Sequence, residues 1–120
     1  MSNIHIHYNS IDGSSVPWVY VKDSLARRRH DWSVHDNVVL QALGSPMTML
    51  YFVNVDNVNV RRNVSHSGTA NVYSRLGIEF QAASGSLTVV NNDFSGACSA
   101  YVKDHATATV FDSANVVSAC

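Results

Sequence analysis

The sequence predicts an all-β solenoid, a fold in which one short structural unit repeats along the chain. A six-residue pattern occurs four times, as apolar, polar, apolar, two variable residues and asparagine. The asparagines are Asn9, Asn37, Asn63 and Asn92, at intervals of 28, 26 and 29 residues (9 to 37, 37 to 63, 63 to 92). Near-constant self-similarity of this size is typical of solenoids. The composition agrees, because Val, Asn, Ser and Ala are prominent and helix-favouring Glu and Lys are rare.

Each copy of the pattern predicts one strand with an inner and an outer face, because side chains alternate along a strand. The residues five and three positions before the asparagine are all apolar and are assigned to the inner face: Ile4 and Ile6, Trp32 and Val34, Val58 and Val60, Leu87 and Val89. A bend and a shorter apolar step follow each asparagine, at Ile11, Val39 and Phe94, with Ser65 as the exception.

A second strand is predicted later in each unit. Val19–Asp23 closely matches Ala100–Asp104, and Leu50–Val55 and Leu76–Phe80 occupy the equivalent places between them. Each unit therefore has at least two strands and two turns, and each strand pairs in parallel with its counterparts in the neighbouring units. The chain reads as one domain over residues 1–120, with units at roughly 3–30, 31–56, 57–85 and 86–105 and a partial unit over 106–120.

The repeat resembles the right-handed parallel β-helix of the pectate-lyase-like group, to which many bacteriophage tailspikes belong. The resemblance covers nearly the whole chain and implies a right-handed parallel β-helix of about four to five rungs. In that group, stacked asparagines often line the bend after the first strand, where this chain has its four asparagines. Such a ladder would satisfy polar groups that the bend buries.

The polar residues between the inner ones form two outward columns, His5, Ser33, Asn59, Thr88 and His7, His35, Arg61, Val90. In the pectate-lyase-like group saccharides lie along this kind of sheet face, and imidazole, guanidinium and carboxylate groups hydrogen-bond to sugars. A solvated face without a ligand is the alternative. The candidate saccharide contacts are His5, His7, His35, Asp36, Arg61 and Arg62.

Three of these residues are also weak candidates for a metal site. His5 and His7 form an HxH pair and His35 lies one unit later, so three imidazoles could hold zinc or iron. The pair lies at the amino-terminal end of the repeat, and no metal or other cofactor is predicted.

Catalysis by this chain alone is not favoured. Glycoside hydrolysis needs two facing carboxylates, and no predicted pair shares a face in adjacent units. Serine chemistry has no GxSxG motif. Arg61 near His35 is the best available base for a lyase, but no motif of fixed spacing supports it.

The net charge and the absence of long apolar segments argue against nucleic-acid binding, export by a signal peptide and membrane insertion. A formal net charge of −1 does not favour nucleic acid, and the sequence has neither a signal-peptide pattern nor an apolar run of about 20 residues that could span a membrane. Cys98 and Cys120 are expected to be free thiols in a reducing cytosol. The basic run Arg27–His30 is expected at a solvated loop tip, and Tyr20 and Tyr101 on the outer side of the second strand.

The resemblance thus implies a bacteriophage tailspike or tail-fibre component that presents or supports a site for host surface polysaccharide. It would be made in the host cytoplasm and reside in the virion tail. Open strand edges at both ends are expected to be covered by further copies of the chain, by another protein or by a longer parent chain. The resemblance to tailspikes implies a homotrimer or association with other tail proteins. Two alternatives remain: a fragment of a polysaccharide lyase or hydrolase, and a purely structural or folding-assistance module.

Overall fold

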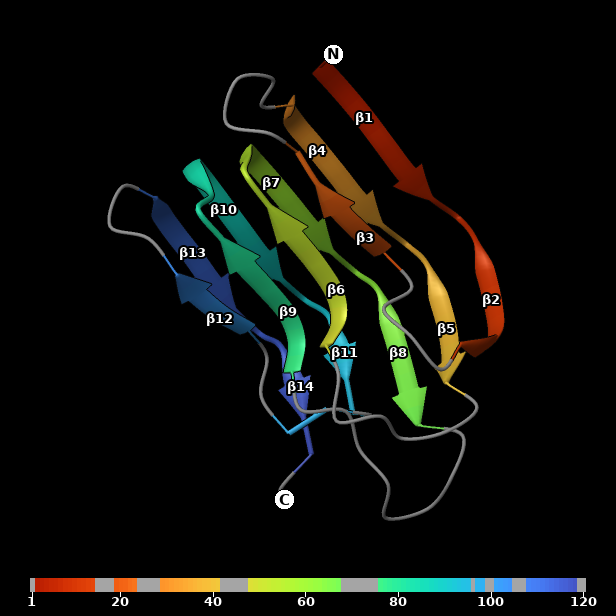
Figure 1. The fold of residues 1–120 in the computed structure, drawn as a ribbon. Helices are drawn as coiled ribbons and strands as arrows, with labels where there is room; N and C mark the ends of the chain where they lie inside the picture. Colours follow the sequence, from red (N-terminus) through yellow and green to blue (C-terminus); the bar gives the residue numbers. More distant parts are fainter. Residues whose placement is uncertain are drawn as a thin grey trace.

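The computed structural model describes residues 2–14, 19–23, 29–41, 48–67, 76–95, 97–98, 101–104 and 108–118. The regular structure of these residues is β-strand, in three parallel sheets (Figure 1). Sheet A contains β1 (Ser2–His7), β4 (Arg29–His35), β7 (Val55–Arg61), β10 (Ser84–Val90) and β13 (Thr109–Ser113). Sheet B contains β2 (Ser10–Ser14), β5 (Val38–Gln41), β8 (Val64–Ser67), β11 (Asp93–Phe94) and β14 (Val116–Val117). Sheet C contains β3 (Val19–Lys22), β6 (Thr48–Val53), β9 (Leu76–Gln81) and β12 (Tyr101–Asp104).

Each sheet takes every third strand of the chain, so neighbouring strands are one repeat apart in sequence. The predicted parallel pairing of equivalent strands is confirmed. The short apolar step after each asparagine is a strand of its own, which makes three strands per repeat. In the last, partial repeat, β13 and β14 extend sheets A and B.

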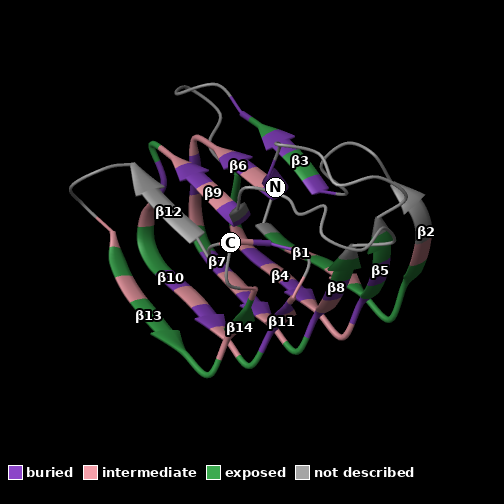
Figure 2. Cartoon of the chain, turned by 90° about the horizontal axis from the view of Figure 1, so that it is seen from below, coloured by how far each residue is buried: buried purple, intermediate pink, exposed green. Residues whose placement is uncertain are grey.

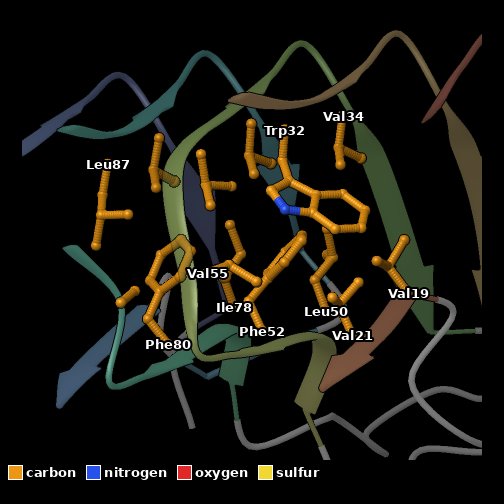
Figure 3. Close-up of a cluster of buried hydrophobic side chains, with 14 of the residues drawn as sticks. Val19, Val21, Trp32, Val34, Leu50, Phe52, Val55, Ile78, Phe80 and Leu87 are labelled. Atoms are coloured by element: carbon orange, nitrogen blue, oxygen red, sulfur yellow. The ribbon is translucent and has the colours of Figure 1, made fainter. Parts of the chain in front are cut away.

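The inner faces of the sheets enclose the hydrophobic core, and the predicted inner positions of sheet A are confirmed. Val34, Val60 and Val89 are fully buried, whereas Ile4 and Ile6 on edge strand β1 are only partly buried. Trp32 of sheet A lies edge-on to Phe52 of sheet C, with ring centroids 6.0 Å apart, so sheets A and C share one core (Figure 3). In Figure 2 exposed residues lie on the edge strands β13 and β14 and also on β5 and β8 of sheet B.

The asparagines form a hydrogen-bonded ladder along the corner between sheets A and B. The side-chain amide nitrogen of Asn37 donates to Oδ1 of Asn63 at 2.9 Å and to the Ile6 carbonyl at 3.1 Å. Asn63 repeats both bonds, to Oδ1 of Asn92 and to the Val34 carbonyl. Each Oδ1 also accepts the backbone N–H of the preceding asparagine. A buried amide with all its hydrogen bonds made is stable where an unpaired one would not be.

The ladder has one more step than the sequence pattern predicts. Asn92 donates to Oδ1 of Asn115 at 2.9 Å. The Asn115 amide donates to Oδ1 of Asp112 at 2.7 Å and to the Val89 carbonyl. Asp112 therefore ends the ladder at the carboxyl-terminal side.

The residue before each ladder asparagine has a left-handed backbone conformation. Its φ is 55° at Tyr8, 56° at Asp36, 51° at Arg62 and 55° at Asn91. A second left-handed position occurs early in four of the five sheet A strands, at Asn3, Asp31, Asn57 and Gly85. The glycine accompanies a register shift between β10 and β7. The backbone turns sharply at these points. The left-handed residue before each ladder asparagine directs one side chain per repeat outward beside sheet A.

Replacing Gly85 with alanine is expected to lower the free energy of unfolding by about 1–3 kcal/mol. The φ of Gly85 is 73°, and an added Cβ would collide with Oδ1 of Asn57, which accepts the backbone N–H of Ser86 at 3.0 Å. Urea denaturation followed by circular dichroism measures the change. Ser86→Ala at the next, exposed position is the control and should be near neutral; equal stability of both variants would contradict the assignment.

Two predictions about chain ends and loops are wrong. Cys98 is disulfide-bonded rather than free; Cys120, the chain's other cysteine, lies outside the described residues. The backbone N–H of Ser118 donates to the Ala97 carbonyl at 2.8 Å, so the segment that ends at Ser118 lies beside Cys98, which the sequence alone did not reveal. Arg29 and His30 begin β4 rather than lying in a loop, and Arg29 binds Asp23 at 2.6 Å. Arg27 and Arg28 lie outside the described residues.

The match between Tyr20 and Tyr101 is also wrong by one residue. Tyr20 pairs with Tyr51, which pairs with Glu79 and then Val102, whereas Tyr101 pairs with Ile78. Tyr20 is exposed and stacks on Tyr51, with ring centroids 5.2 Å apart. The two tyrosines were matched because the residues around them are similar, without regard to how the strands pair. A shift of one residue in strand pairing exchanges the two faces of a strand.

Removing the disulfide, by reductant or by Cys98→Ser, is expected to lower the free energy of unfolding by about 2–4 kcal/mol. The bond constrains the unfolded chain, and its loss should appear as a lower urea midpoint. Thiol titration of the unreduced, denatured protein is the direct check. Two reactive thiols per chain would contradict the bond.

Candidate functional site

The outer face of sheet A carries the two predicted polar columns in register. His5, Ser33, Asn59 and Thr88 are successive partners across β1, β4, β7 and β10, and Phe111 of β13 extends this first column. His7, His35, Arg61 and Val90 form the second column, followed by Ser113. The structure therefore brings the sequence-predicted residues onto one face.

A groove of about 310 Å³ lies on this face, along the first column. Its other side is formed by residues six positions before each ladder asparagine: Asn3, Asp31, Asn57 and Ser86. This second side was not predicted from the sequence. A signal existed, since three of the four residues are Asn or Asp, the non-glycine types that most readily adopt the left-handed conformation found there. The groove crosses four strands and is lined mainly by small polar side chains.

Aromatic and imidazole rings gather at the β1 end of the second column. The rings of His7 and His35 are stacked, with centroids 5.0 Å apart and an interplanar angle of 5°. Tyr8 lies edge-on to both, at 4.9 Å from His7 and 5.6 Å from His35. His5 lies farther off, 6.3 Å from His7.

Asp36 joins this cluster to Arg62. Two bonds of 2.9 Å connect the Arg62 guanidinium to the carboxylate, and Nδ1 of His35 lies 2.6 Å from Oδ2. Asp36 and Arg62 occupy the left-handed positions before successive ladder asparagines, which explains why they meet. Arg62 above all, and then His35, hold the pKa of Asp36 well below its usual range. Asp36 in turn raises the pKa of Arg62.

Arg61 differs from Arg62 because it has no carboxylate partner among the described residues. Its Nε is buried without a hydrogen-bond partner, and so is Oδ1 of Asn59, two residues earlier on the same outer face of β7. One atom is a donor and the other an acceptor. The outer side of β7 therefore holds one donor and one acceptor without hydrogen-bond partners, and both atoms are enclosed by their neighbours.

The three histidines do not form a metal centre in this structure. Within the described residues, no group of three or more His, Cys, Asp or Glu side chains is placed to hold a metal ion. The parallel rings of His7 and His35 do not converge on a common point, and the Nδ1 of His35 is taken by Asp36.

Comparison with protein-family models, with curated proteins and with solved structures gave no match. The part of the chain that the structure describes contains no helix able to cross a membrane. The site must accordingly be interpreted from its own geometry.

Asp36→Asn is expected to destabilise the protein more at neutral pH than in acid. The folded pKa of Asp36 lies below the unfolded value of about 3.9, so its ionised form stabilises the fold above that pH and the contribution declines as the pH falls. The difference in urea midpoint between parent and variant, measured from about pH 7 to about pH 3, should shrink. A difference that stays constant would contradict the role of the charge.

Proposed function

We propose that the chain is a short right-handed parallel β-helix that serves as a tailspike or tail-fibre component and binds a bacterial surface polysaccharide on the outer face of sheet A. Neighbouring strands of each sheet are three strands apart along the chain, so each pair is joined by a crossover connection. Connections between parallel strands of one sheet are right-handed in about 98% of cases, which supports the right-handed winding. The groove along the first column is the observation that carries the binding proposal.

The composition of the groove suits a saccharide. Its amide and hydroxyl groups both donate and accept hydrogen bonds, as sugar hydroxyls do. At roughly 4.8 Å between strands, four strands give the groove a length of about 14 Å, enough for several linked sugar rings. The neighbouring His7, Tyr8 and His35 rings provide flat surfaces against which a sugar face can pack.

The open edges support an oligomeric assembly, for which we propose a trimer. Ile4 and Ile6 at one end are only partly covered, and Phe111, Val116 and Val117 at the other are exposed. Unpaired edges of this kind are normally covered by another chain. The disulfide at Cys98 is compatible with a virion surface, where disulfides persist. Light scattering tests the assembly, and a stable monomer of about 13 kDa would overturn it.

Binding is tested with capsule and lipopolysaccharide preparations immobilised on a sensor surface. Ser33→Tyr places a large side chain in the middle of the groove and is expected to abolish binding. Ser10→Tyr, at an exposed position of β2 on sheet B, is the control and should bind like the parent. If Ser33→Tyr binds as tightly as the parent protein, the saccharide does not bind in the groove. Absence of any glycan binding would overturn the proposal in favour of a structural module, and release of new reducing ends would favour a depolymerase.

A further inference from the structure

The last repeat covers only two of the three sheets at its end of the molecule. Its strands β13 and β14 pair with β10 and β11, whereas β12 of sheet C has no further partner strand among the described residues. Both residues of β14 are exposed, and so are all those of β13 except Val110. Asp112 pairs with Val89, so an aspartate takes the inner position at which the earlier repeats have isoleucine or valine. The last repeat therefore extends the apolar core poorly.

A disulfide fastens this repeat to the one before it. Cys98 follows β11 and is disulfide-bonded, and the sequence has one other cysteine, Cys120, after β14. The bond therefore joins the chain before and after the last repeat. Ser118 also donates its backbone N–H to the Ala97 carbonyl at 2.8 Å and its hydroxyl to the Ser95 carbonyl. When the disulfide is open, only noncovalent contacts hold β13 and β14 in place.

The first repeat offers a more complete continuation of the core than the last repeat does. Its strands β1, β2 and β3 are edge strands of the three sheets, and each has one side unpaired within the described residues. In strand register, Ile6 occupies the same inner position as Asp112, and Ile4 the same position as Val110. Both isoleucines are only partly buried. Placed against β10, the first repeat of a second copy would bury an apolar side chain where the last repeat has an aspartate.

Asn9 of a second copy can also take the place of Asn115 in the asparagine ladder. Oδ1 of Asn115 accepts the backbone N–H of Asn92 at 3.1 Å and its side-chain amide at 2.9 Å. The Asn115 amide donates to the Val89 carbonyl at 2.8 Å. Asn9 has the same groups at the same place in its repeat, and its Oδ1 receives no donor from the described residues. Exchanging one asparagine for the other would therefore conserve these three bonds.

We propose that opening the disulfide lets the first repeat of a second copy displace β13 and β14 and pair with β10, β11 and β12. The strands of each sheet are parallel, so β1, β2 and β3 match the direction that these edges require. Pairing in two sheets is replaced by pairing in three. Because the two joined ends differ, each added copy presents a new end, and the copies form an open chain. The disulfide prevents this growth, and the inference does not depend on saccharide binding.

The first test compares the oxidised parent with Cys98→Ser, in which the bond cannot form. Light scattering after size-exclusion chromatography gives the particle mass over about a hundredfold range of protein concentration. The mass of the parent, whether monomer or trimer, should stay constant, whereas that of Cys98→Ser should rise about twofold or more. Equal masses of the two proteins at every concentration would overturn the inference.

Blocking the first repeat distinguishes end-to-end joining from general aggregation. Ile6→Asp in the Cys98→Ser background keeps the exchangeable last repeat but places a charge on the inner face of β1. This double variant should not grow by itself, yet it should form a mixed complex with the oxidised parent, whose β1 edge is intact. Val38→Asp in the same background, at an exposed position of sheet B, is the matched control and should grow like Cys98→Ser.

Two results of this second test would overturn the inference. One is growth of the Ile6→Asp double variant by itself, which would show aggregation that does not use the β1 edge. The other is the absence of a mixed complex with the oxidised parent. Circular dichroism verifies that each variant keeps its β-sheet spectrum before the masses are compared. Ile4→Asp makes the same change two residues earlier on β1 and replaces Ile6→Asp if that variant does not fold.

Discussion

Val60→Asp is expected to unfold the protein. Val60 is fully buried on β7, between Val34 and Val89 in the inner column of sheet A. An aspartate there would place a carboxylate in an apolar interior, at a cost of about 4 kcal/mol or more. This is comparable to the whole stability of many domains, about 5–15 kcal/mol. Loss of the β-sheet circular dichroism spectrum at neutral pH is the expected observation.

Val38→Asp provides the matched control, because the same substitution is made at an exposed valine. Val38 is 53% exposed on β5 of sheet B, so its aspartate remains in water. The control should fold with a stability within about 1 kcal/mol of the parent. A Val60→Asp protein as stable as Val38→Asp would mean that the inner column has been assigned to the wrong face.

Asn92→Asp is expected to lower the free energy of unfolding by about 3 kcal/mol or more, although it changes only an amide to a carboxylate. The variant loses the amide donor that serves the Val60 carbonyl and Oδ1 of Asn115. At neutral pH it also gains a charge at a position that is 2% exposed. Urea denaturation at about pH 7 measures the loss.

Asn91→Asp is the control for this substitution, since it makes the same change one residue earlier. Asn91 is exposed, and aspartate tolerates its left-handed φ of 55°. Its stability should stay within about 0.5 kcal/mol of the parent. Similar losses in both variants would show that the ladder contributes nothing beyond local backbone effects.

The parts of the fold that depend on local alternation could be predicted from sequence. Val34 and Val60 are buried because every second residue of a strand faces the same way, and this is visible in one strand alone. The ladder from Asn9 to Asn92 was predicted because four copies kept one register. Asn115 was missed, because the fifth copy lacks the complete pattern.

Features that depend on how repeats stack could not be predicted in the same way. The groove requires the left-handed positions at Asn3, Asp31 and Asn57 to be aligned on neighbouring strands, and the sequence analysis considered only alternation. The ion pair of Asp36 and Arg62 likewise depends on two corners 26 residues apart meeting in space. Both residues were predicted as ligand contacts, but the structure pairs them with each other.

The asparagine ladder gives the molecule a polarity. Every ladder amide donates toward the following repeat, so the two ends of the chain differ chemically. At the last repeat, Asp112 takes the donor and closes the series. At the first, Oδ1 of Asn9 receives no donor from the described residues. An asparagine placed one repeat before Asn9 would thus meet a free acceptor, whereas one placed a repeat after Asn115 would compete with Asp112 for the Asn115 amide.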